Sequence, residues 1–183
     1  MHWLRTLFVY ATVSIAGSAQ GVRQEISFGA GALSPLSGFK AEDHTTGFEL
    51  RVGYQLRLRK HLGAEVGWTG AWPSRTEFGR DFDQVVRDRL QLVDYGVRGI
   101  VPVARDRAEL SAGVGGGYIW YDQGSSNSYL NGSLLQYSGR VTAPVTPRRR
   151  FWVGITLRVW RDPGRPTQQW LSTTADLAYR FGR

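Results

Sequence analysis

Apolar and polar residues alternate one by one along most of the chain after residue 22. In the run 46–59, apolar side chains from Phe48 to Leu58 share one parity, and mostly polar residues from Glu49 to Arg59 share the other. Successive side chains of a β-strand point to opposite faces, whereas a helix would scatter both kinds around its axis. The pattern therefore predicts strands with one apolar and one polar face.

The same alternation recurs along the chain and predicts eight strands, at 22–33, 46–59, 62–72, 89–103, 108–120, 130–143, 150–160 and 169–181. Each run reaches the length of about 9–11 residues that a tilted membrane-spanning strand needs. The connections alternate between short turns, at 59–61, 104–107 and 146–149, and longer polar stretches, at 34–45, 73–88, 121–129 and 161–167. Short turns at one end and long loops at the other are typical of outer-membrane barrels. We therefore expect an all-β fold, an eight-stranded antiparallel up-and-down transmembrane β-barrel.

The polar face of these strands mixes opposite charges with Gly, Ser and Thr. If the apolar face meets lipid, the polar face lines a lumen that side chains fill, and charges confined there must be paired. The predicted lumen charge network comprises Glu49, Arg51, Arg57, Glu65, Asp94, Arg98, Glu109, Arg140, Arg158, Asp176 and Arg180.

Aromatic residues collect near the predicted strand ends, which matches the aromatic girdles at the two interfaces of a membrane barrel. Phe48, Trp68, Trp72, Trp120, Trp160 and Trp170 lie toward the longer connections, and Phe151, Tyr179 and Phe181 lie toward the short turns. A lipocalin-like barrel would instead point its apolar face inward. The Gly-x-Trp signature of lipocalins is absent from 22–33. A secreted soluble lipocalin-like ligand-binding barrel nevertheless stays open as an alternative.

The first nineteen residues have the pattern of a secretory signal peptide. Arg5 supplies the positive charge, 7–16 is an apolar core, and the small residues Gly17–Ala19 precede the expected cleavage site after Ala19. A membrane-spanning helix needs about twenty apolar residues, which this stretch lacks. We expect residues 1–19 to be removed on export, leaving 20–183 as one barrel domain.

Composition narrows the possible functions. The chain has no cysteine, which excludes disulfides, a thiol nucleophile and cysteine-based metal sites. A net charge of +8 raises the question of nucleic acid, but the arginines are spread along the strands and turns instead of forming one patch, so no nucleic-acid binding is expected. The basic turns at 57–60, 105–107 and 148–150 either contact anionic lipid headgroups or are simply solvated.

Two local patterns suggest chemistry. Gly113–Gly117 resembles a phosphate loop but lacks its Gly-Lys-Ser/Thr ending, so close packing of a barrel strand explains it better. His44 with Ser74 or Asp81 could form a catalytic set near the barrel rim, although the sequence does not show the required geometry. We assign no catalytic, cofactor-binding or metal-binding residue and expect no cofactor.

The signal peptide, the eight amphipathic strands and the last strand at 173–181 resemble small bacterial outer-membrane barrels of the OmpA/OmpX type. In that family an aromatic residue at the end of the closing strand signals insertion to the barrel assembly machinery, and Phe181 matches it, followed here by Gly182 and Arg183. The resemblance implies an outer-membrane location, contacts with outer-membrane lipids and with the assembly machinery, and a monomer. It implies a non-enzymatic role in envelope structure or surface interaction through long extracellular loops. The alternative within this fold is a lipid A-modifying enzyme, an acyltransferase or deacylase.

Overall fold

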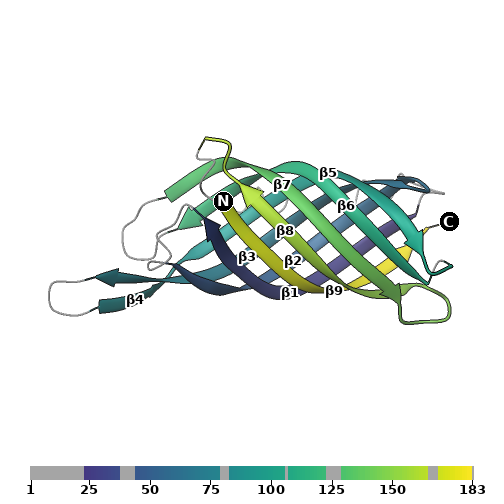
Figure 1. Cartoon of the computed structure of the whole chain (residues 1–183), viewed down its shortest axis with the longest axis horizontal. Helices are drawn as coiled ribbons and strands as arrows, with labels where there is room; N and C mark the ends of the chain where they lie inside the picture. The colour runs from purple at the N-terminus through teal and green to yellow at the C-terminus, as the bar shows by residue number, and fades with distance from the viewer. Residues whose placement is uncertain are drawn as a thin grey trace.

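The computed structural model describes residues 23–37, 44–78, 83–105, 107–122, 129–164 and 169–182. These residues form β1 (Gln24–Ser37), β2 (His44–Arg59), β3 (Leu62–Phe78), β4 (Asp83–Arg87), β5 (Arg89–Val103), β6 (Ala108–Asp122), β7 (Tyr129–Pro144), β8 (Phe151–Arg161) and β9 (Gln169–Phe181). All of these strands except β4 wind obliquely around one axis (Figure 1). The predicted signal peptide at 1–19 lies outside the described residues. Within the described part of the chain, no helix is long and apolar enough to cross a membrane.

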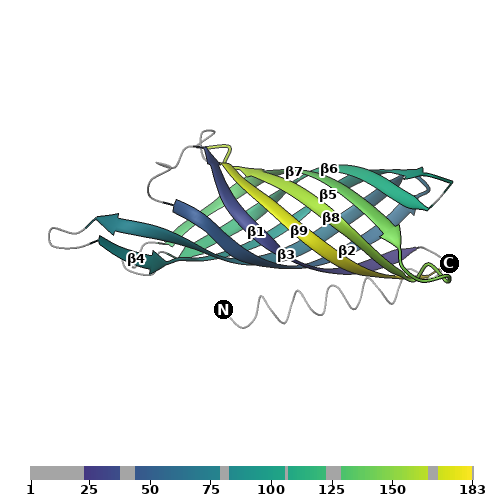
Figure 2. The same cartoon turned by 60° about the horizontal axis from the view of Figure 1, so that its bottom comes forward.

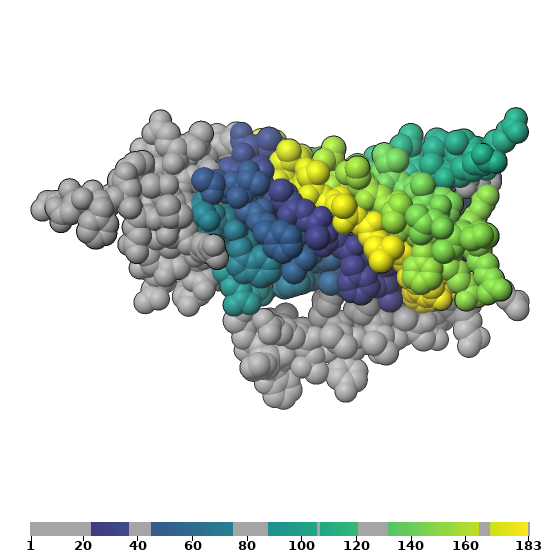
Figure 3. Space-filling model, turned by 90° about the horizontal axis from the view of Figure 1, so that it is seen from below, coloured from purple at the N-terminus to yellow at the C-terminus, as the bar shows by residue number. Residues whose placement is uncertain are grey.

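The barrel closes because its first and last strands pair. β1 and β9 are antiparallel, from Gln24 opposite Phe181 to Ser37 opposite Gln169, and the two lie side by side on the face shown in Figure 3. The pairing of β2 with β3 completes the circle, so each of the eight barrel strands has a partner on both edges. The prediction of an eight-stranded antiparallel up-and-down barrel is confirmed.

The two ends of the barrel differ, as Figures 1 and 2 show. At one end, which we name the turn end, short connections follow β2, β5 and β7, and the chain enters β1 and leaves β9. Ala104, Arg105 and Arg149 in these turns have positive φ angles of 51°, 56° and 52°, which tight reversals require. The opposite end, which we name the loop end, holds the connections after β1, β3, β6 and β8.

The region 73–88 is not the polar loop that the sequence suggested. β3 continues to Phe78 and pairs with β4, from Ser74 opposite Arg87 to Phe78 opposite Asp83. This hairpin extends beyond the barrel at the loop end (Figure 1). The prediction was wrong because β-branched and aromatic residues within this polar stretch favour strands, and two arms leaving the barrel satisfy their backbone groups by pairing with each other.

The apolar face points outward and the polar face points inward. In β8 the outward Ile155 is 59% exposed, whereas the inward Thr156 is fully buried. The other strands show the same division: outward residues such as Phe28 and Val101 are exposed, whereas inward residues such as Glu49 are buried. This arrangement is the reverse of a lipocalin-like barrel, so the alternative of an apolar ligand-binding interior is wrong.

Candidate functional site

The middle of the lumen is filled by ion pairs between strands. Arg51 on β2 donates to both carboxylate oxygens of Asp94 on β5, with 2.6 Å from Nη2 to Oδ1. Arg98 on β5 contacts Glu65 on β3, with 2.7 Å from Nη2 to Oε2. Asp94 is fully buried and Arg98 is almost so. Buried charges of this kind are tolerated because each has an opposite charge and further hydrogen bonds, such as that from Arg51 to Thr69, at 3.0 Å.

Nearer the turn end, arginines share carboxylates across the lumen. Glu25 on β1 accepts from Arg140 on β7 and from Nε of Arg180 on β9, the latter at 2.6 Å. Glu109 on β6 accepts at the same oxygen, Oε2, from Arg57 at 2.8 Å and from Arg180 at 2.7 Å. Apart from the contact between Glu25 and Arg180, which lie opposite each other on the paired strands β1 and β9, these contacts link strands that are not neighbours in the sheet, so they brace the barrel across its lumen.

The structure brings most of the predicted network together. Asp176 joins it through Nε of Arg140, at 3.3 Å. Glu49 and Arg158 are both buried, but among the described residues neither forms an ion pair: Glu49 accepts from Ser172 at 2.8 Å, and Arg158 donates to Thr174 at 3.5 Å. Sequence reasoning left out Glu25. Its parity with the inward-facing residues of β1 was the signal that could have found it. With Glu25, the network contains six arginines and six carboxylates, so its formal charges cancel.

An apolar plug fills the lumen toward the loop end. It is formed by the buried side chains of Leu33, Ala71, Leu90, Leu92, Leu134, Trp160 and Trp170. Trp160 and Trp170 lie opposite each other on β8 and β9 and are 1% and 6% exposed. Their placement in the outer girdle was therefore wrong. Trp160 follows the outward residue Val159, and Trp170 precedes the outward residue Leu171. Because side chains alternate between the two faces of a strand, both tryptophans point inward.

The other predicted girdle residues stand on the outward parity of their strands. Near the loop end Phe48 stacks on Trp72, with 6.3 Å between ring centroids, and Trp120 contacts Tyr118 at 4.8 Å. Near the turn end Tyr179 lies 5.1 Å from Phe151 and 6.0 Å from Phe181. Trp68 flanks Gly70, at which an added Cβ would lie 2.8 Å from the Trp68 ring. These rings form two clusters at opposite ends of the outer face, and their role as girdles stays a prediction.

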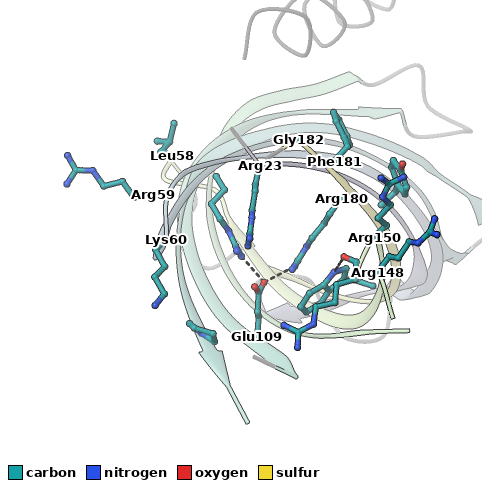
Figure 4. Close-up of a pocket in the computed structure, with 15 residues that line it drawn as sticks. Arg23, Leu58, Arg59, Lys60, Glu109, Arg148, Arg150, Arg180, Phe181 and Gly182 are labelled. Carbon is teal, nitrogen blue, oxygen red and sulfur yellow. Dashed lines mark hydrogen bonds and ion pairs between the residues drawn. The ribbon is translucent and has the colours of Figure 1, made fainter. Parts of the chain in front are cut away.

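A cavity of about 910 Å3 opens at the turn end, and we name it the vestibule. Figure 4 shows Arg23 and Arg180 pointing into it toward Glu109, and Arg59 pointing away from it. The guanidinium of Arg180 also lies over the Trp152 ring, 3.5 Å from its centroid. Charged residues line the vestibule, with Glu109 as the carboxylate and the cations Arg23, Arg57, Arg59, Lys60, Arg148, Arg149, Arg150 and Arg180.

The structure assigns no chemical role to the glycine run at 113–117 or to His44 with Ser74 or Asp81, the two patterns that suggested a phosphate loop and a catalytic set. Gly113–Gly117 lies inside β6, where an added Cβ at Gly115 would come within 1.9 Å of the Tyr95 carbonyl oxygen. Close approach of two strands therefore accounts for this run of glycines. The backbone register places Thr45, next to His44, opposite Ser74, while Asp81 lies outside the described residues. Among the described residues, no group of three His, Asp or Glu side chains could hold a metal ion.

No protein-family model matches the chain, and no curated protein matches it. Solved structures do match its fold. OprG, an outer-membrane protein of Pseudomonas aeruginosa, superposes with a TM-score of 0.68 at 9% identity, over 90% of this chain and 98% of that one. Neisserial surface protein A gives 0.63 at 14% identity, over 86% and 97%. Ail, the attachment invasion locus protein of Yersinia pestis, gives 0.56 at 12% identity, over 88% and 99%.

At these identities the likeness concerns the fold, and it spans nearly the whole of each neighbour. The closed eight-stranded barrel, with its apolar exterior and charged interior, gives the chain the fold of small outer-membrane β-barrels, the type that the sequence resembles. The recognition made from the strand pattern is confirmed for the fold.

Proposed function

We propose that the protein is a non-enzymatic integral outer-membrane barrel that acts through the surface it presents at the loop end, in envelope structure or surface interaction. The chain enters β1 and leaves β9 at the turn end, which we place in the periplasm, so the loop end faces the outside. We further propose that it works as a monomer surrounded by outer-membrane lipids, that Phe181 is read by the barrel assembly machinery, and that the cleaved segment at 1–19 directs export.

The observation that carries this proposal is the closed lumen. The apolar plug around Trp160 and the ion pairs of Arg51 and Arg98 occupy the interior. A lumen filled by side chains leaves no path for diffusion, which argues against a role as a wide diffusion pore. The remaining surface available for a function outside the cell is the loop end, where the β3–β4 hairpin extends beyond the barrel (Figure 1).

A first experiment tests location and orientation. The full chain is expressed in a Gram-negative host, and we expect it in the outer-membrane fraction, where it should migrate faster on a gel before heating than after. Trypsin added to intact cells should cut within the β3–β4 hairpin, which contains Arg75 and Arg87, and leave the turn end intact. Recovery in the soluble periplasmic fraction, or protection of the hairpin in intact cells, would contradict the proposal.

A second experiment separates the two roles. The variant replaces residues 76–85 by Asn-Gly, which joins Arg75 to its direct partner Val86 through a two-residue turn. A strain lacking the gene is complemented with the wild type or with this variant, and uptake of a hydrophobic dye is measured. If the wild type and the variant both reduce dye uptake, the barrel itself carries the envelope role. If only the wild type reduces dye uptake, the surface of the hairpin carries it. Equal dye uptake with and without the gene would contradict the envelope role.

A further inference from the structure

The vestibule has a large excess of positive charge for its size. Eight cationic residues and one carboxylate residue, Glu109, are among the described residues that line its 910 Å3, although the side chain of Arg59 points away from it (Figure 4). The lumen network next to it is neutral, so its carboxylates already have partners. Glu109 itself is shared between Arg57 and Arg180. Arg57 and Arg180 already belong to that neutral network, and the salt bridges among the described residues include none to the other six cations of the vestibule.

Two of the vestibule cations, Arg23 and Arg148, have side chains without a partner among the described residues. The side chain of Arg23 points into the vestibule toward Glu109 (Figure 4), yet this guanidinium makes no hydrogen bond or ion pair with any other described residue. Arg148 likewise has no partner within the described ranges. Guanidinium groups bind phosphate oxygens through two parallel N–H donors. A concave site lined by one sign of charge also concentrates ions of the opposite sign.

The wall around these cations is fixed rather than loose. Nε1 of Trp152 donates to the carbonyl oxygen of Arg149 at 2.7 Å, and the Arg180 amide donates to the carbonyl oxygen of Arg150 at 2.7 Å. Trp152 is 4% exposed and supports the Arg180 guanidinium on its face, a favourable cation–π contact. The basic turn after β7 is thus tied to the barrel, which keeps its arginines at the mouth.

We propose that the vestibule binds a phosphate-bearing polyanion that approaches from the turn end. Several cations surround one entrance, so a ligand with two or more negative charges would satisfy them better than a monovalent ion. The phosphate could belong to a soluble molecule or to a lipid headgroup. The inward direction of Arg23 and Arg180 favours the soluble source, because headgroups lie around the outer rim.

The test uses the full-length mature chain folded in a neutral maltoside detergent, with inorganic tripolyphosphate as the probe and isothermal titration calorimetry as the readout. We expect saturable binding of one probe per barrel that weakens as salt is raised. The variant Arg23→Gln/Arg148→Gln should weaken binding by about tenfold. Both side chains lack partners among the described residues, so the lumen network and the heat-dependent gel shift should be unchanged.

The matched control is Arg105→Gln/Arg107→Gln. It removes the same charge from another turn at the same end, and neither residue lines the vestibule. We expect its affinity to match the wild type. Absence of saturable binding by the wild type would overturn the proposal. Equal losses in the two variants would overturn it too, since they would show a general effect of charge.

A competition experiment separates the two sources of phosphate. Glycerol 3-phosphate and short-chain phosphatidylglycerol, below its micellar concentration, are each titrated against bound tripolyphosphate. Displacement by glycerol 3-phosphate supports the site with a soluble ligand. Displacement by phosphatidylglycerol alone supports it with a lipid headgroup. Failure of both at saturating concentration would overturn the assignment of the site to biological phosphates.

Discussion

Single residues hold the interior of this barrel together through charges that solvent hardly reaches. Asp94 is fully buried against Arg51, so replacing Asp94 alone leaves a buried guanidinium without its counter-ion. We expect Asp94→Leu to lower the free energy of unfolding by about 3–5 kcal/mol, because an uncompensated buried charge is costly. Urea unfolding in detergent micelles measures this.

The control for this prediction is the double variant Arg51→Met/Asp94→Leu, which removes both charges. It should be more stable than Asp94→Leu, since apolar residues of similar size often replace a buried ion pair without loss. A double variant less stable than the single variant would show that the remaining arginine finds other partners in the lumen.

Glycines on the strands differ in what surrounds them, and this gives a second prediction at the residue scale. An added methyl group at Gly115 would meet the Tyr95 carbonyl oxygen at 1.9 Å, whereas at Gly139 nothing lies within 4 Å. Overpacking against a backbone atom should cost Gly115→Ala about 1–3 kcal/mol in the free energy of unfolding. Gly139→Ala should stay within about 0.5 kcal/mol of the wild type. Equal effects in urea unfolding would contradict the close approach of β5 and β6.

At the scale of the strand, the depth of an outward residue in the bilayer decides how much its replacement by arginine destabilises the barrel. Ile155 lies in the middle of the outward face of β8 and Phe151 at its turn end. We expect Ile155→Arg to destabilise the barrel in lipid vesicles by about 2–4 kcal/mol, and Phe151→Arg by about 0–1 kcal/mol, because arginine is costly at the bilayer midplane and tolerated at the interface. Unfolding measured in vesicles distinguishes the two. Equal costs would place the membrane elsewhere on the barrel.

The β3–β4 hairpin is an element that the barrel does not need. β3 pairs with β5 from Leu62 to Ala71, below the hairpin. The variant that replaces residues 76–85 by Asn-Gly should therefore keep the wild-type heat-dependent gel shift and the wild-type midpoint of urea unfolding. A lower midpoint would show that the hairpin also supports the strands beneath it.

The whole barrel should not conduct ions. The apolar plug and the neutral charge network fill successive parts of the lumen, so the purified protein in a planar lipid bilayer should show no steady conductance. An outer-membrane porin recorded in the same lipid provides the positive control. Stepwise, long-lived currents from the wild-type barrel would contradict the filled lumen.

The sequence predicted the strands well because the two faces of each barrel strand meet different surroundings. An apolar outer surface on one side and a filled polar lumen on the other impose a period of two, as in 48–58, where every second residue is apolar. Two details escaped this reasoning. The hairpin after Ala71 was missed because it lies beyond the barrel and its arms lack the two-faced pattern. Trp160 and Trp170 were misplaced because aromatic residues near strand ends were given more weight than the alternation itself.

The sequence by itself determined the number of barrel strands, the outward face and most of the charged residues that line the lumen, because alternation is a local property of neighbouring residues. Only the tertiary structure decided which charges meet. Glu25 and Arg140 are 115 residues apart and Arg57 and Glu109 are 52 apart, and they come together because closure of the barrel sets strands face to face across a narrow lumen. The same closure gathers the basic turns around one vestibule and the inward tryptophans into one plug. The geometry of the closed barrel fixes these contacts, and the order of residues along any single strand does not.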